Sequence, residues 1–205
     1  MQELYNEVTK QFQKRHHIAH DIKHALRVAQ LAKYIAQAEG YDVREAEIAG
    51  LLHDMGRTVQ EEEKNHGPAG VPLSRELLNK YTDYDNATKE RILSAIEHHS
   101  ELHTTGVLTH IVQDADMLDG MGAVGLMRAY MSKADLPDYD PENMVPTKGQ
   151  RGTNVHDQIA FQMEWLEFMH TPTGKRLAQK RYDVMLNFLK TLQAEVTLKD
   201  AEDAI

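Results

Sequence analysis

Apolar residues recur along most of the chain at the spacing of helices. His24, Val28, Leu31, Ile35 and Ala38 follow one another at intervals of four, three, four and three residues, which is one face of a helix. Comparable patterns predict further helices over residues 42–53, 73–81, 88–99, 108–129, 155–169 and 174–195. No alternation of apolar and polar residues is long enough for a sheet, although a short hairpin fits between residues 131 and 154. The pattern therefore predicts an all-α fold.

Breaks in this pattern predict where helices begin and end. Gly40 closes the first helix, and Asp42 with Glu45 has the form of a capping box at the start of the next. Residues 61–70 are polar and predict a loop. Residues 131–154 are rich in proline and glycine and show no helical period, so we predict a long irregular loop there. Loops of this length in a compact domain are usually functional lids or disordered.

Length and composition limit the class of protein. A chain of 205 residues has the size of one well-packed domain, so we expect a single helical bundle over residues 1–205. The net charge of −9 argues against a nucleic-acid partner, and the lack of cysteine excludes disulfides and thiolate zinc sites. No stretch has the apolar length of a signal peptide or a membrane span, so we expect a cytoplasmic protein without a membrane partner.

Histidines and aspartates stand at core-facing positions of several predicted helices. His24 begins one apolar stripe and His99 ends another. The pair His53 and Asp54 follows an apolar run, and Asp116 lies one helical turn after an apolar residue. A single buried histidine is usually a hydrogen-bonded core residue, whereas an unpaired buried carboxylate is very costly. The joint pattern therefore predicts one polar centre in an apolar bundle.

A metal ion is one way to stabilise such a centre, because imidazoles and carboxylates are common metal ligands. His53 and Asp54 can converge on an ion that lies beyond the end of their helix. Asp54 has two oxygens, so it can bridge two ions while His53 binds one. The sequence therefore predicts a metal-dependent enzyme built from helices.

The motifs resemble the HD-domain metal-dependent phosphohydrolase superfamily. The order His24, His53-Asp54, Asp116 matches the signature of that superfamily. Further segments resemble its YedJ/YpgQ-like bacterial branch, and the likeness covers roughly residues 17–195; these segments are residues 65–68, 95–99, 111–119, 122–125, 156 and 169–178, with Arg181. His98-His99 is not followed by the Gly-Tyr-Pro motif of the cyclic-dinucleotide branch, which argues against cleavage of cyclic dinucleotides.

The resemblance implies an all-α fold of the HD-domain type, with a metal-binding core over about residues 17–130 and C-terminal helices over 155–195 that pack on it. It also implies hydrolysis of phosphoester or phosphoanhydride bonds in nucleotides, including nucleoside-triphosphate pyrophosphohydrolysis. His24, His53, Asp54 and Asp116 match the core metal ligands. A second ion would be held by His66 together with one of two neighbouring histidines, His98 or His99. The cofactor is then one or two divalent ions: Mn, Fe, Co, Ni, Zn or Mg.

Other residues receive roles in the expected mechanism. Asp54 or Asp119 orients the attacking water, and Asp119 can alternatively fix a ligand histidine. Arg57 lies three residues beyond Asp54 and is expected at the same mouth. The expected substrate-binding residues are Lys23, Arg27, Arg128, Lys148, Arg151 and His156. His20 either joins the site or covers the start of its helix, and the sequence favours the second reading.

Two other classes of function remain open on the sequence. A di-iron oxygenase uses the same helical scaffold with two irons, and a non-catalytic regulator binds a nucleotide without hydrolysing it. The expected partner is a small phosphorylated substrate, and a homodimer is one expected state of assembly. The intact candidate ligands argue against the regulator, because a sensor could lose them.

Overall fold

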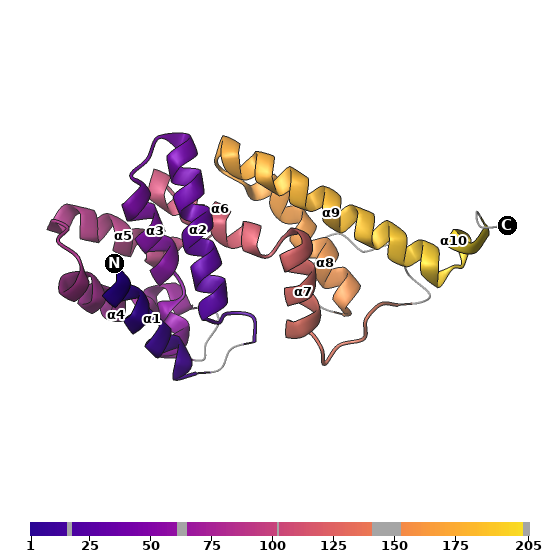
Figure 1. The fold of residues 1–205 in the computed structure, drawn as a ribbon, viewed down its shortest axis with the longest axis horizontal. Helices are drawn as coiled ribbons and strands as arrows, with labels where there is room; N and C mark the ends of the chain where they lie inside the picture. Colours follow the sequence, from indigo (N-terminus) through magenta and orange to yellow (C-terminus); the bar gives the residue numbers. More distant parts are fainter. Residues whose placement is uncertain (16–17, 61–64, 102, 141–152, 203–205) are drawn as a thin grey trace. The chain divides into compact units, whose positions relative to one another are not determined.

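The computed structural model describes residues 1–15, 18–60, 65–101, 103–140 and 153–202, and this part of the chain is helical and contains no strand. The prediction of an all-α fold is confirmed (Figure 1). The helices are α1 (Gln2–Gln13), α2 (Ile22–Glu39), α3 (Val43–Leu52), η1 (Met55–Thr58), α4 (His66–Tyr81), α5 (Asn86–His98), α6 (Val107–Asp119), α7 (Gly122–Ser132), α8 (Val155–Met163), η3 (Glu164–Phe168), α9 (Pro172–Val196) and α10 (Lys199–Glu202), where η denotes a 3-10 helix.

The chain divides into two compact units. The first comprises Met1–Asp116 together with His170–Gly174, and the second comprises Met117–Met169 together with Lys175–Ile205. Helix α6 therefore begins in the first unit and ends in the second. The packing of the C-terminal helices on the metal-binding core stays a prediction.

The first unit is built around apolar helix faces. Helix α2 packs along α3, and α4 packs against both η1 and α5. Val28 and Ile35 of the predicted α2 stripe are inaccessible to solvent, whereas Leu31 is half-buried and Ala38 is exposed. The buried face of α2 is completed by Ala32, which the predicted stripe did not contain. Ile92 and Ile96 of α5 are equally buried. The apolar periodicity therefore identified the faces that form the core.

Side-chain caps set the beginnings of the main helices. The carboxylates of Asp21, Asp42 and Asp85 accept hydrogen bonds from backbone amides three residues later, at 3.0, 2.7 and 2.8 Å. Gly40 ends α2 in the left-handed conformation, with φ of 73°, as its position predicted. The predicted capping box is half formed, because the Glu45 carboxylate binds Arg91 and Tyr41 instead.

The predicted helix over residues 108–129 is wrong as a single element. It divides into α6 and α7 at Gly120 and Met121, and Gly122 has a left-handed φ of 70°. A side chain at Gly120 would overlap the ring of Trp165, so packing against this distant residue requires a glycine at the break. Helix 155–169 likewise divides, into α8 and η3.

Two further boundaries differ from the prediction. Helix α4 begins at His66, within the stretch predicted as a loop. Pro68 falls in its first turn, where a missing N–H costs no helical hydrogen bond. Helix α1 was not predicted, although Leu4, Val8 and Phe12 form its buried stripe. Residues 133–140 and 153–154 are irregular as predicted, and residues 141–152 lie outside the described part of the chain.

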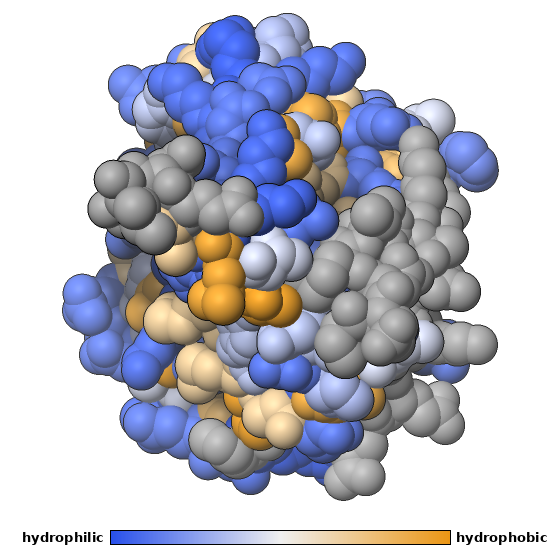
Figure 2. All heavy atoms as spheres, turned by 90° about the vertical axis from the view of Figure 1, so that its right-hand side faces the viewer, coloured by the Kyte–Doolittle hydropathy of each residue, from blue (hydrophilic) through white to orange (hydrophobic). Residues whose placement is uncertain are grey.

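The surface is mixed in character. On the face drawn in Figure 2, a group of apolar side chains lies among polar ones. Half-exposed apolar residues of the second unit include Met127 and Met131, at 56% and 53% exposure. Within the described residues, no helix is both long and apolar enough to cross a membrane.

Candidate metal centre

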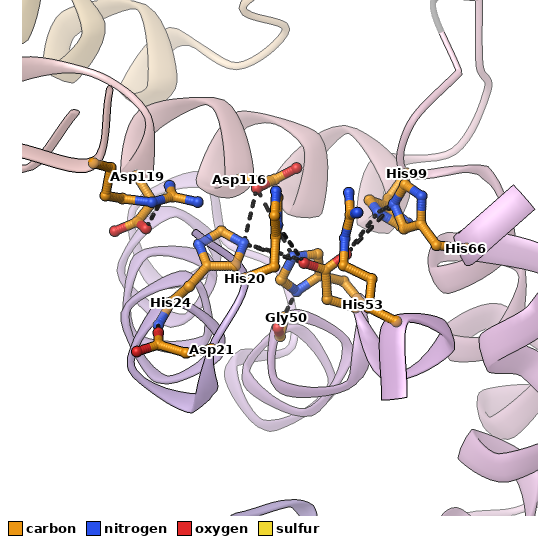
Figure 3. A network of polar contacts seen from close by, with 12 residues as sticks. His20, Asp21, His24, Gly50, His53, His66, His99, Asp116 and Asp119 are labelled. Carbon is orange, nitrogen blue, oxygen red and sulfur yellow. Dashed lines mark hydrogen bonds and ion pairs between the residues drawn. The ribbon is translucent and has the colours of Figure 1, made fainter. Parts of the chain in front are cut away.

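Histidines and aspartates from separate elements of the first unit converge at one place (Figure 3). The side chains of His24, His53, Asp54 and His99 are almost completely buried, and His66 is 6% exposed. Asp116 lies at the solvent-accessible side of this group, with its side chain 32% exposed. The convergence predicted from the apolar stripes is therefore present in the structure.

The first subsite is formed by two imidazoles and two carboxylates. The Nε2 atoms of His24 and His53 lie 3.2 Å apart. Asp116 Oδ1 lies 3.3 Å from His24 Nε2 and 3.8 Å from His53 Nε2. Asp54 Oδ2 lies 3.5 and 3.6 Å from the same two nitrogens. Ligand atoms that share one ion at about 2.0–2.2 Å lie roughly 3–4.4 Å from one another, depending on the angle at the ion, so these distances fit a divalent cation. His24, His53 and Asp116 offer ligand atoms that all lie within 4.8 Å of one another.

The second oxygen of Asp54 faces a second subsite. Asp54 Oδ1 lies 3.4 Å from His66 Nε2 and 3.8 Å from His99 Nε2. The two imidazole nitrogens lie 2.9 Å apart. Each oxygen of Asp54 thus faces a different pair of imidazoles, which is the arrangement that a carboxylate bridging two ions requires.

The protonation of His53 and His99 supports a cation at both subsites. Nδ1 of His53 lies 2.8 Å from the carbonyl of Gly50, and Nδ1 of His99 lies 2.7 Å from the carbonyl of Ile96. A carbonyl only accepts, so Nδ1 carries the proton and the neutral ring directs the lone pair of Nε2 into the cluster. A positive charge between such lone pairs and the neighbouring carboxylate oxygens stabilises both, and a ligand histidine commonly makes this hydrogen bond through its other nitrogen.

The local sequence explains the position of both rings. His53 and His99 are each the residue that directly follows a helix, α3 and α5 respectively. From this C-cap position each ring turns back to the carbonyl three residues earlier, which fixes its orientation. His24 lies in the first turn of α2, where the cap from Asp21 binds its backbone amide. The ligands are therefore held at helix ends, where the chain direction changes.

Three glycines bring His66 into the cluster. A Cβ atom at Gly56 would overlap the carbonyl of His66, and one at Gly67 would overlap the carbonyl of Glu97. A Cβ atom at Gly70 would overlap the backbone of Gly56. We call these three residues the glycine seam. The seam lets the first turn of α4 approach η1 and α5 at backbone distance, which places His66 beside His99.

Arg57 and His20 complete the surroundings of Asp54. Arg57 Nε donates to Asp54 Oδ1 at 2.8 Å, and His20 Nδ1 lies 2.8 Å from Oδ2. Burial on its own would raise the pKa of Asp54, but the nearby His53 and His20 outweigh it and hold that pKa well below the usual range. The pKa of Asp116 is lowered in the same way against the effect of burial, by its hydrogen bond with His24 and by His53. Both carboxylates are therefore ionised at neutral pH.

The other predicted site residues lie in different parts of the structure. In the first unit, Lys23 is exposed on α2, and Arg27 is half-buried one turn after His24. His98 faces outward with its side chain 41% exposed and its ring against Glu101, so His99 is the member of the pair that joins the cluster. Lys148 and Arg151 lie outside the described residues.

The remaining predicted residues belong to the second unit. Asp119 is buried and forms an ion pair with Arg128 at 2.9 Å. His156 is 2% exposed, burial lowers its pKa, and its Nδ1 has no hydrogen-bond partner among the described residues. The roles assigned to these three residues stay predictions.

His20 lies at the centre, although the sequence favoured a position outside it. The favoured interpretation placed it over the start of its helix, whereas the structure places its ring against a carboxylate of the centre. The usable signal was its spacing of four residues from His24, which is one helical turn. That signal was weak, because His20 precedes the cap residue Asp21 and lies outside the helix.

The metal-free protein is expected to lose stability in mild acid. Burial lowers the pKa of His53 and His99, so below about pH 6.5 the unfolded chain binds protons that the folded chain does not. As the pH is lowered below about 6.5, the free energy of unfolding should decrease by up to about 1.4 kcal/mol per pH unit for each imidazole. Urea denaturation between pH 7.5 and 5.5, in chelator, measures this slope. His99→Gln should reduce the slope, and a stability that is level or rises toward pH 5.5 would contradict the prediction.

Comparisons with known proteins agree with this geometry. A family model described as HD domain matches residues 21–121. The uncharacterized protein YpgQ of Bacillus subtilis is 30% identical over 200 residues, which cover 89% of this chain and 87% of YpgQ. Ribonuclease Y of Desulfotalea psychrophila is 38% identical over 100 residues, but these are 48% of this chain and 18% of that enzyme.

Solved structures share the fold over nearly the whole chain. An HD-superfamily hydrolase of Bacillus thuringiensis superposes with a TM-score of 0.76 at 23% identity, covering 95% of both chains. Bacillus subtilis YpgQ in complex with ADP superposes with a TM-score of 0.71 at 24% identity, covering 95% of this chain and 96% of YpgQ. Both likenesses support the all-α fold.

The chain therefore belongs to the HD-domain family and is a metal-dependent hydrolase. Within that family it is a relative of YpgQ, because the similarity extends over most of both chains. The similarity to ribonuclease Y is confined to about half of this chain, which agrees with a shared HD domain in different proteins.

Proposed function

We propose that this protein hydrolyses a phosphoester or phosphoanhydride bond of a nucleotide, with one or two divalent ions held by the cluster. The observation that carries the proposal is the set of inward-directed Nε2 lone pairs, the Asp116 carboxylate and the Arg57 guanidinium around one ionised carboxylate, Asp54. His24, His53, Asp54 and Asp116 would hold the first ion, and His66, His99 and Asp54 would hold the second.

The nucleotide in this proposal is supported by a relative. YpgQ of Bacillus subtilis has been crystallised in complex with ADP, and it is 30% identical to this chain over most of its length. When bound, a divalent ion supplies charge that offsets phosphate oxygens and lowers the pKa of a water molecule. Nucleotides carry such phosphates, so the donor set and the ligand of the relative point to the same chemistry.

Arg57 is suited to bind a phosphate of the substrate. Its Nε is held by Asp54, and its side chain is 11% exposed. No partner is recorded for its other two nitrogens among the described residues. A guanidinium fixed at one nitrogen presents the remaining donors in a fork that matches phosphate oxygens. Lys23 and Arg27, on the first turns of α2, would add positive charge beside the centre.

His20 is suited to hold the proton that the leaving group needs. Its Nδ1 donates to Asp54, and its side chain is 28% exposed, so Nε2 can face the substrate. A carboxylate beside an imidazole stabilises the imidazolium, whose Nε2–H can pass to the departing oxygen. His20 would thus act on the leaving group while Asp54 holds the ring in position.

His20→Gln is expected to lower kcat by about 10²- to 10⁴-fold, the range of a lost general acid, while KM changes by less than about threefold. Steady-state kinetics on both enzymes measure kcat and KM. His98→Gln is the matched control, because His98 is exposed and lies outside the cluster. A kcat for His20→Gln within threefold of the parent would refute the assignment.

The substrate class is tested by a panel of compounds with each of several divalent metals. Phosphate release is measured with and without added pyrophosphatase, which separates loss of phosphate from loss of pyrophosphate. The panel contains nucleoside mono-, di- and triphosphates, simple phosphoesters and a short oligoribonucleotide. We expect hydrolysis of nucleotides and none of the oligoribonucleotide. Cleavage of the oligoribonucleotide alone would overturn the proposed substrate class.

The same preparation distinguishes the alternative functions. Two irons per chain with oxygen-dependent product formation would establish an oxygenase. Two subsites bridged by a carboxylate are also suited to a pair of irons. A melting temperature that rises with a nucleotide, without hydrolysis of any compound under any metal, would establish a regulator. The proposal requires hydrolysis that depends on the metal and proceeds without oxygen.

A further inference from the structure

A short segment at the start of α9 belongs to the first unit although the chain on both sides of it belongs to the second. We call this segment, His170–Gly174, the strap. Thr171, Thr173 and Gly174 of the strap are buried. The sequence around the strap was part of the resemblance described above, and neither the metal centre nor the proposed chemistry uses it.

The strap is bound to α6 through one carboxylate. The backbone amide of His170 donates to Asp114 Oδ1 at 2.8 Å. The backbone amide and the hydroxyl of Thr171 donate to Asp114 Oδ2 at 2.8 and 2.6 Å. Asp114 is completely buried, so these three donors take the place of the hydrogen bonds that water would make to its carboxylate.

Further contacts fix the strap itself. The amide of Gly174 donates to the Thr171 hydroxyl at 2.9 Å, and the amide of Thr173 donates to Glu39 at the end of α2, at 2.8 Å. The ring of His170 stacks on that of His110 of α6, with centroids 4.1 Å apart and planes at 3°. The strap therefore joins α6 to α2, the helices that carry Asp116 and His24.

Glycine at position 174 permits this close approach. A Cβ atom there would overlap the Asp114 carboxylate and lie 2.9 Å from the Thr171 hydroxyl. Any side chain at this position would therefore push the strap away from α6. The contact between the strap and Asp114 therefore depends on a glycine at position 174 as well as on the hydrogen bonds.

The geometry of α6 connects the strap with the metal centre. Asp114 and Asp116 are two residues apart, which is about 200° around a helix, so they leave α6 on opposite sides. The strap holds one side, and Asp116 on the other lies 3.3 Å from His24 Nε2. A rotation or slide of α6 that released Asp114 would move Asp116 away from the imidazoles.

We infer that Asp114 is a positioning residue, which with the strap fixes α6 so that Asp116 is held at ligand distance from His24 and His53. This inference rests on the proposed metal centre. It assigns to Asp114 and Thr171 an effect on metal affinity although neither residue contacts the cluster.

Asp114→Asn tests the inference, because it keeps the volume of the side chain and places an amide NH₂ against backbone donors. We expect Mn²⁺ binding, measured by titration calorimetry and by the electron paramagnetic resonance spectrum of the bound ion, to weaken by about 10- to 100-fold. Glu45→Gln is the matched control. Glu45 is also a buried carboxylate that accepts three hydrogen bonds, from Arg91 and Tyr41, but it joins α3 to α5. Glu45→Gln should leave Mn²⁺ affinity within about twofold of the parent.

A second pair of variants keeps the test valid if Asp114→Asn does not fold. Thr171→Val removes the hydroxyl that binds Asp114 and Gly174, and it should weaken Mn²⁺ binding, whereas Thr171→Ser should restore it. Parent-like affinity and spectrum in folded Asp114→Asn or Thr171→Val would overturn the inference and leave the proposed function intact. An equal loss of affinity in Glu45→Gln would also overturn it. Failure of the parent protein to bind Mn²⁺ or any other divalent ion would instead sink the proposed metal centre and the inference with it.

Discussion

Asp54→Asn is expected to reduce kcat/KM by at least about 1000-fold, equivalent to roughly 4 kcal/mol of transition-state stabilisation. Among the described residues, Asp54 is the one whose two oxygens face both pairs of imidazoles, at 3.4–3.8 Å. An asparagine has one oxygen and no negative charge, so it can neither bridge two cations nor hold Arg57 and His20 as the carboxylate does. The loss should therefore exceed that of any other single ligand.

Two measurements separate this effect from misfolding. Metal content per chain should fall in Asp54→Asn, while the far-ultraviolet circular dichroism should match that of the parent. Glu45→Gln again serves as the control, because it removes a buried carboxylate with three hydrogen bonds outside the centre. It should retain kcat/KM within about threefold. An Asp54→Asn enzyme that kept more than a tenth of the parental kcat/KM would refute the central role of this carboxylate.

Removal of the metal by a chelator is expected to abolish the activity and to destabilise the fold. A ligand that binds only the folded chain stabilises it by RT ln(1 + [L]/Kd), which is about 2.7 kcal/mol when the ion is present at 100 times its Kd. For a chain of about 200 residues this corresponds to roughly 5–11 °C in melting temperature. The facing lone pairs and carboxylates of the empty centre add to the effect, because they repel one another when no cation lies between them.

Thermal unfolding in chelator and after readdition of Mn²⁺, Ni²⁺, Co²⁺ or Zn²⁺ measures this shift. The same titration on Asp54→Asn should give a much smaller rise, which would show that the stabilisation comes from this centre and not from surface binding. Full activity after exhaustive chelation, with the metal content shown to be below a tenth of an ion per chain, would be incompatible with the proposal.

Local helix geometry is what made the first subsite predictable. The side chains of His24 and Asp116 follow directly from apolar stripes with a period of 3.6, because the stripe and its polar member share one face. The same argument pointed to His99 through the stripe that it ends, and its ring indeed lies in the cluster while that of His98 faces outward. These positions depend only on residues a few places away in the chain.

The features that the sequence did not predict depend on contacts between distant residues. The start of α4 at His66 requires Gly67 to approach the carbonyl of Glu97, 30 residues further along. The break between α6 and α7 depends on the ring of Trp165. The strap contacts Asp114 across 56 and 57 positions of sequence. No periodicity within one segment can report such contacts, because their partners lie outside the segment.

The glycine seam has a consequence for how this scaffold can diversify. At Gly56, Gly67 and Gly70 main chain lies against main chain, so the distance of His66 from η1 and α5 is set by backbone thickness. Hydrophobic contacts can be retuned by exchanging one side chain for another of similar volume, but a contact without side chains offers nothing to exchange. We therefore expect relatives with this scaffold to vary in substrate preference through side chains at the rim of the centre, while the position of His66 stays the same.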